Sequence, residues 1–179
     1  MVTILSRDPG APPVDYIRVS GGLYRDMMIH DFDIARWLVG EDFTAVQAMG
    51  AVMVDPAIGE AGDVDTAVVT LSTDSGKLVN ISNSRRASYG YDQRIEVHGS
   101  EGMLQADNVL ESSVVLSSAA GVIADKPMHF FLERYAAAYQ AEWDGFVQLV
   151  LDGERTMPNQ YDGLESLRLA EAASAQVLL

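Results

Sequence analysis

The sequence contains no cysteine in its 179 residues. This absence excludes a disulfide framework, thiolate catalysis and cysteine-ligated zinc. Basic residues are also scarce, because 12 Lys and Arg stand against 26 Asp and Glu, for a formal net charge of −14. A chain this acidic has too few cations to neutralise many phosphates or to bind an anionic membrane. We therefore expect neither nucleic acid nor membrane as a partner.

Long hydrophobic runs and a dinucleotide fingerprint are missing too. The sequence has no run of about 18 apolar residues, so it predicts no membrane span. Its N-terminus also lacks the basic segment followed by an apolar stretch that is typical of a signal peptide. These features favour a cytoplasmic location. No G-x-G-x-x-G follows a predicted strand, and the glycines at Gly21-Gly22 and at Gly99 and Gly102 have the wrong spacing for one. The sequence therefore predicts no cofactor-binding residues of its own.

The residues that are present predict one globular domain over 1–179. Hydrophobic residues make up 48% and charged residues 21%, which is ordinary for a domain with a sizeable core. Short segments that alternate in polarity or are rich in β-branched residues predict strands. They are Met1–Leu5, Thr44–Val54, Ala67–Ser72, Leu78–Ser84, Arg94–Val97, Met103–Ala106 and Ser113–Leu116.

Turn residues and helical periodicity complete the predicted architecture. Short connections at Asp74–Gly76 and Gly99–Gly102 favour antiparallel hairpins. Phe130–Asp152 and the segment from Tyr161 to the end predict helices, with the aromatic side chains of the first in the core. The fold class is thus α+β, an open and mostly antiparallel sheet with helices packed on one face. The other face, if apolar, should be covered by a second subunit or domain.

The segment Ser20–Gly40 carries the strongest candidate for chemistry. Its pattern predicts one helix after Gly21-Gly22, with Asp26, His30 and Asp33 on one face because residues three and four apart are neighbours. One carboxylate can orient the imidazole while the other ring nitrogen takes a substrate proton. Asp31 is a misfit, since it projects among apolar residues. We interpret this stripe as a candidate proton-transfer centre.

Two other interpretations of the stripe stay open at this point. A histidine with acidic helical neighbours is often a solvated surface face. Asp and His at i and i+4 can also share a metal ion, although zinc needs three or more protein ligands and His98 and His129 lie in unrelated contexts. The letters HDFD are superficially similar to HD phosphohydrolases, but those proteins are all-helical, which the strand-rich middle of this sequence disfavours.

Three segments together carry a family resemblance. SGGLYRDMMIHDFDIARWLVGE, SNSRRASYGYDQRIEVHGSEGMLQADN and PNQYDGLESLRLAEAA follow one another along nearly the whole chain. In this order they resemble the C-terminal half of the Gfo/Idh/MocA oxidoreductases, and within that family the inositol 2-dehydrogenases. The resemblance implies an NAD(P)-dependent oxidation of a polyol or sugar hydroxyl, with myo-inositol as the expected substrate. It also implies homodimers or tetramers through the exposed sheet face.

The resemblance assigns roles to particular residues. His30 falls on the family's catalytic histidine and would take the hydroxyl proton, and Asp26 falls on the accompanying aspartate that binds or orients the substrate. Tyr89 and Tyr91 are similar to residues that line the sugar pocket. Asn83 and Arg85, on the same strand end, are further substrate-binding candidates.

The sequence also departs from the family pattern. The family's enzymes begin with a Rossmann domain, which this chain lacks, and their catalytic lysine lies in a Glu-Lys-Pro motif, whereas Lys126-Pro127 here has no preceding Glu. NAD or NADP would therefore be bound mainly by the absent domain, and we expect the isolated chain to be inactive. The alternative is a non-catalytic binding or oligomerisation module that keeps the fold.

Overall fold

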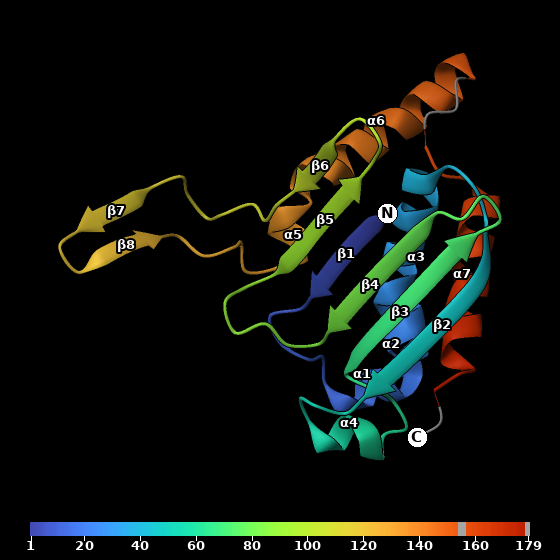
Figure 1. The fold of residues 1–179 in the computed structure, drawn as a ribbon, viewed down its shortest axis with the longest axis horizontal. Helices are drawn as coiled ribbons and strands as arrows, with labels where there is room; N and C mark the ends of the chain where they lie inside the picture. The colour runs from blue at the N-terminus through green and yellow to red at the C-terminus, as the bar shows by residue number, and fades with distance from the viewer. Residues whose placement is uncertain (154–156, 178–179) are drawn as a thin grey trace.

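The computed structural model describes residues 1–153 and 157–177 of the chain (Figure 1). In chain order the elements are β1 (Val2–Arg7), α1 (Val14–Ser20), α2 (Leu23–Asp26), α3 (Met28–Val39), β2 (Phe43–Ala51), α4 (Pro56–Glu60), β3 (Thr66–Thr73), β4 (Leu78–Ser84), β5 (Asp92–His98), β6 (Met103–Ala106), β7 (Val115–Ser118), β8 (Gly121–Ala124), α5 (Phe131–Arg134), α6 (Ala136–Asp152) and α7 (Gln160–Ser174). None of the helices described is long and apolar enough to cross a membrane.

Six strands form one sheet in the order β2-β3-β4-β1-β5-β6. Strand β1 runs parallel to β4 and antiparallel to β5, and the other neighbouring pairs of this sheet are antiparallel. The turns at Asp74–Gly76 and Gly99–Gly102 join β3 to β4 and β5 to β6, as predicted. The expected α+β class with an open, mostly antiparallel sheet is therefore confirmed.

The core lies between the sheet and the two helices α3 and α7, which Figure 1 shows behind the strands. Alternate residues of the strands, such as Ile4, Leu71 and Ile81, are fully buried against Phe32 of α3 and Leu169 of α7. This alternation follows from the two-residue period of a strand. Each fully buried side chain of this kind stabilises the fold by roughly 1.5–3 kcal/mol.

The prediction of one continuous helix through the Asp26–Asp33 stripe is wrong. Helix α2 ends at Asp26 and α3 begins at Met28, and Met27 between them has a φ of −111°. Two glycines with positive φ, Gly21 at 91° and Gly22 at 86°, precede this break and reverse the chain after α1. The chain thus turns at both ends of the four-residue helix α2.

The aromatic side chains of the penultimate helical segment are not in the core, contrary to expectation. The segment divides at Tyr135 into α5 and α6, and no residue of α6 is buried. Tyr139, Trp143 and Phe146 are 46%, 63% and 46% exposed. Helical periodicity reports that one side of a helix is apolar, but it does not report what covers that side. Residues 178–179 of the predicted last helix lie outside the described residues.

Asp65 organises the connection between β2 and β3. Its carboxylate is fully buried and accepts hydrogen bonds from the backbone N–H groups of Met53, Val54 and Asp55 at 2.8–3.0 Å, and from the hydroxyl of Thr66 at 2.9 Å. Burial works to raise the pKa of Asp65, but the backbone hydrogen bonds outweigh it and lower that pKa below its ordinary value.

We expect Asp65→Ala to lower the free energy of unfolding by about 3 kcal/mol, because three backbone donors lose their acceptor. Urea unfolding followed by circular dichroism measures the change. Asp74→Ala, in the exposed β3–β4 turn, is the matched control and should change stability by less than about 0.5 kcal/mol. Equal stability of the two variants would contradict this role for Asp65.

Asp31, the misfit of the helical pattern, is buried with amide partners. It is 2% exposed and accepts hydrogen bonds from Nδ2 of Asn83 at 2.8 Å and Nε2 of Gln93 at 3.3 Å. Burial raises the pKa of Asp31 from 3.8 to about 7, against the opposing effect of these two hydrogen bonds. The negative charge of Asp8 raises it further. Asp31, on the apolar side of α3, thus links this helix to the sheet through hydrogen bonds.

The raised pKa of Asp31 predicts a pH dependence of stability. Because the folded state binds this proton more tightly than the unfolded state, the free energy of unfolding should fall as pH rises from about 4 to about 7. Between pH 5.5 and 7.5 the wild-type protein should lose about 2 kcal/mol more than Asp31→Asn. Urea unfolding at the two pH values measures both, and an identical slope in the variant would contradict the prediction.

Candidate functional site

The candidate site begins at the end of α2, where the Asp26 carboxylate is held by two donors. Nη1 of Arg85 donates to Oδ2 at 3.0 Å, and the phenol of Tyr16 donates to Oδ1 at 2.6 Å. Arg85 follows β4 and Tyr16 lies on α1, so three separate elements meet at this carboxylate. Because both oxygens already have a donor, the plane of the carboxylate is fixed before any substrate arrives.

The Arg85 guanidinium is 1% exposed and lies between two carboxylates. Its Nη2 lies 3.5 Å from Oδ2 of Asp63, whose Oδ1 accepts the backbone N–H of Leu23 at the start of α2. Gly22 is required there, since a Cβ at this position would lie 2.9 Å from Oδ1 of Asp63 and the φ is +86°. Asp63 and Arg85 therefore fix both ends of α2.

His30 lies in the first turn of α3, exposed to solvent. Among the described residues no hydrogen bond to its imidazole is present, and Asp26 and His30 share none. An imidazole that is not committed to a protein partner is available to accept a proton from a ligand. The direct support of His30 by Asp26 stays a prediction.

Tyr89 is fixed next to a buried acid. Its hydroxyl donates to Oδ2 of Asp92 at 2.5 Å and accepts from Nη1 of Arg7 at 3.2 Å. Asp92 is fully buried, and although burial works to raise its pKa, the hydrogen bonds from Arg94, Tyr89 and Asn108 lower that pKa to about 2. The Tyr89 ring, 42% exposed, is thus held by its hydroxyl at the loop before β5.

Tyr91 is half-buried and packs edge-on against Tyr135, with ring centroids 5.8 Å apart. Burial raises the pKa of Tyr91, and the negative charges of Asp8 and Asp31 contribute to the shift. Asn83, predicted beside it as a substrate-binding residue, is 0% exposed and donates to Asp31. The side chains of Asn83 and Arg85 are therefore buried, whereas Tyr89 and His30 are exposed and Tyr91 is half-buried.

Sequence reasoning missed three residues that shape this site, namely Asp8, Asp63 and Tyr16. Burial raises the pKa of Asp8 to about 6, the positive charge of Arg85 lowers it, and the negative charge of Asp26 raises it. Asp8 precedes Pro9-Gly10, a pair typical of a turn, and directly follows a strand. A polar residue directly after a buried strand is the signal that could have marked it as a candidate.

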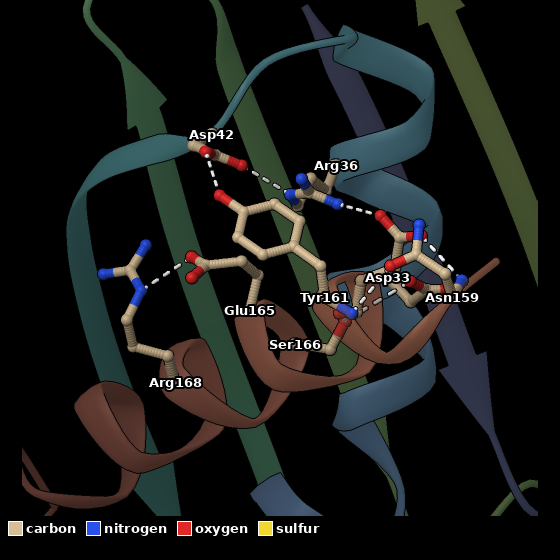
Figure 2. A network of polar contacts seen from close by, with 9 residues as sticks. Asp33, Arg36, Asp42, Asn159, Tyr161, Glu165, Ser166 and Arg168 are labelled. Carbon is tan, nitrogen blue, oxygen red and sulfur yellow. Dashed lines mark hydrogen bonds and ion pairs between the residues drawn. The ribbon is translucent and has the colours of Figure 1, made fainter.

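Asp33, the third member of the predicted stripe, belongs to a different neighbourhood from Asp26. Oγ of Ser166 on α7 lies 3.4 Å from its Oδ1, and Figure 2 shows both beside the start of α7. A network in the same view joins Arg36, Asp42 and Tyr161. Between α3 and the chain that leads into α7 is a hollow of about 350 Å³, lined by Asp33, Ile34, Arg36, Trp37, Met157, Pro158 and Asp162.

The residues described do not fit a dinucleotide cofactor or a metal ion. A dinucleotide fold needs parallel strands with a glycine-rich turn at a helix N-terminus, whereas neighbouring strands of this sheet are mostly antiparallel. No group of three or more His, Asp or Glu arranged to hold a metal occurs in the part of the chain that the structure describes. What the site offers is an accessible imidazole, a fixed carboxylate and two anchored tyrosines.

Comparison with known proteins gives consistent matches. The model of the GFO/IDH/MocA C-terminal domain matches residues 1–105. The chain is 53% identical over 178 residues to inositol 2-dehydrogenase of Rhizobium meliloti (strain 1021), covering 99% of this chain and 54% of the relative. The chain spans about half the length of the curated relatives it matches.

Solved structures agree with the sequence matches. The crystal structure of a myo-inositol dehydrogenase from Corynebacterium glutamicum superposes with a TM-score of 0.94 at 47% identity, covering 98% of this chain and 53% of the other. Scyllo-inositol dehydrogenase from Lactobacillus casei, solved with bound NAD(H) and scyllo-inositol, superposes with a TM-score of 0.86 at 28% identity, covering 98% and 53%. The resemblance read from the sequence is confirmed: this chain belongs to the GFO/IDH/MocA family and has the fold of its C-terminal domain.

Proposed function

We propose that this chain is the substrate-binding half of an NAD(P)-dependent dehydrogenase that oxidises a polyol hydroxyl, with myo-inositol as the substrate. The observation that carries the proposal is the accessible imidazole of His30, four residues after a carboxylate that Arg85 and Tyr16 hold in place. The relatives named inositol 2-dehydrogenase support inositol as the substrate, and the NAD(H)-bound Lactobacillus casei structure supports the class of cofactor.

Oxidation of an alcohol removes one proton from oxygen and one hydride from carbon. In our proposal His30 takes the proton, and Asp26 accepts a hydrogen bond from a neighbouring hydroxyl and thereby orients the ring. The negative charge of Asp26 also favours the imidazolium that forms. The hydride goes to the nicotinamide of NAD or NADP, which is bound mainly by protein outside this chain.

In this proposal two of the remaining predicted residues contact the substrate directly, and two act from the interior. Tyr89 and Tyr91 present their rings toward the polyol, and the hydroxyl of Tyr89 holds that ring in place through Asp92. Asn83 and Arg85 are buried, so they contribute through the carboxylates of Asp31 and Asp26. The buried, hydrogen-bonded side chains would thus hold in place the residues that contact the substrate.

We also propose that a second copy of the chain covers the exposed face of the sheet. On this face Met49 of β2 and Val68 of β3 are cross-strand partners, 73% and 44% exposed. Leu78 of β4, the cross-strand partner of Ser72, adds further exposed apolar area on this face. Apolar side chains spread over neighbouring strands are typical of a face that a partner covers.

One prediction of this proposal concerns reconstitution with a cofactor-binding half. The chain, mixed with or fused to the dinucleotide-binding half of a related inositol 2-dehydrogenase, should form NADH from NAD⁺ and myo-inositol. His30→Ala should lower kcat at least about a hundredfold, because proton transfer loses its base. His98→Ala, an exposed histidine at the end of β5, is the matched control and should retain wild-type activity.

Two results would contradict the proposal. An active His30→Ala enzyme would remove His30 from the reaction. A wild-type mixture that forms a stable complex but oxidises no polyol would instead favour a non-catalytic module.

A further prediction of this proposal concerns the chain by itself. The purified 179-residue chain should form no NADH from NAD⁺ and myo-inositol, since no residue described here positions a nicotinamide. The assay uses the same conditions as the reconstitution, which provides its positive control. Steady formation of NADH by the chain alone would contradict our assignment of cofactor binding to another part of the enzyme.

A further inference from the structure

Tyr16 reaches the Asp26 carboxylate from an element that the sequence did not reveal. It lies on the seven-residue helix α1, which is anchored by buried Ile17 and is followed by the C-cap residue Gly21. The Tyr16 ring is 48% exposed, yet its hydroxyl lies 2.6 Å from Oδ1 of Asp26. The contact therefore contributes little to the packing of the core. Its main effect is on the orientation of the Asp26 carboxylate.

The two donors to Asp26 are complementary in position and in kind. Arg85 approaches Oδ2 from the buried side, as a charged group that is itself fixed by Asp63. Tyr16 approaches Oδ1 from the solvent side, as a neutral donor. A single donor leaves a carboxylate free to rotate about its Cβ–Cγ bond, whereas two donors on different oxygens fix the rotation.

Tyr16 remains a hydrogen-bond donor throughout the working range of pH. The hydrogen bond to Asp26 raises the pKa of the Tyr16 phenol above its ordinary value of 10.0, and the negative charge of Asp26 adds to the shift. The proton therefore stays on the phenol oxygen, and each carboxylate oxygen keeps a lone pair to accept from a ligand hydroxyl.

We propose that Tyr16 is a positioning residue for the oxidation, because it fixes the rotation of the Asp26 carboxylate against Arg85 and so aligns the substrate hydroxyl with His30. This inference rests on the proposed function and adds to it a residue outside the family motifs. Tyr16 does not transfer a proton; it acts through Asp26. Its loss should therefore reduce turnover without unfolding the protein.

The chain offers a closely matched control in Tyr161. Tyr161 is 47% exposed, and its hydroxyl donates to Oδ2 of Asp42 at 3.0 Å, so it forms the same kind of contact away from Asp26. The hydrogen bond to Asp42 raises the pKa of this phenol as well. Any general effect of removing an exposed tyrosine hydroxyl should appear equally in Tyr161→Phe.

The first experiment tests the contact without any activity. Tyrosines of the 179-residue chain are labelled with ¹³C at Cζ, assigned by the Tyr→Phe variants and titrated by NMR. Asp26→Asn should lower the pKa of Tyr16 toward its ordinary value and leave Tyr161 unchanged, and Asp42→Asn should do the reverse. A Tyr16 titration that does not respond to Asp26→Asn overturns the proposal, whatever the enzyme does.

The second experiment tests the consequence in the reconstituted enzyme with NAD⁺ and myo-inositol. Tyr16→Phe should lower kcat about tenfold, with a smaller change in KM, while Tyr161→Phe stays within about twofold of wild type. Circular dichroism and urea unfolding should show Tyr16→Phe as stable as Tyr161→Phe.

Each other result has a definite meaning. Wild-type kinetics for Tyr16→Phe, or equal losses for both variants, overturn the positioning role. A wild-type enzyme that oxidises no polyol overturns the proposed function and with it any role of Tyr16 in that reaction. In that case the titration still reports whether Tyr16 binds Asp26, so the two failures are distinguishable.

Discussion

The buried guanidinium of Arg85 is the constraint on which the candidate site depends. Burying a charge without partners costs several kcal/mol, and Arg85 is 1% exposed. The carboxylates of Asp26 and Asp63 compensate that charge, and both belong to the surroundings of α2. Because Asp63 also accepts the first N–H of α2, the requirement to neutralise one cation fixes the position and direction of the helix that ends in Asp26.

Strand pairing explains why this cation lies where it does. In the sheet described, β1 and β4 run parallel, and their register pairs Arg7 with Ser84 at their C-terminal ends. The residues that follow, Asp8 and Arg85, therefore leave the sheet side by side, and the backbone N–H of Asp8 donates to the carbonyl of Ser84 at 3.1 Å. Parallel neighbours bring polar residues together at one edge of a sheet, which is a frequent location for binding sites.

The sequence predicted the sheet better than it predicted the surroundings of Asp26 and His30. Alternation in β4 and turn residues at Asp74–Gly76 are local signals, and the structure confirms the hairpin they predict. Asp63, which accepts the N–H of Leu23 at the start of α2, is 40 positions away in sequence, and no helical pattern reports such a contact. The sequence did not mark Asp8 either, because its partner in the sheet, Ser84, is remote in sequence. The exposed aromatic side chains of α6 show that helical periodicity identifies the apolar side of a helix but not what packs against it.

The central claim is that His30 and Asp26 contact the same polyol. The most direct measurement is a crystal structure of the chain joined to a cofactor-binding half, with NAD⁺ and myo-inositol bound. Our account predicts an imidazole nitrogen of His30 within about 2.6–3.2 Å of the hydroxyl to be oxidised, and an oxygen of Asp26 on a neighbouring hydroxyl. Inositol bound elsewhere, for example in the hollow beside Trp37 and Pro158, with His30 turned to solvent, would contradict it.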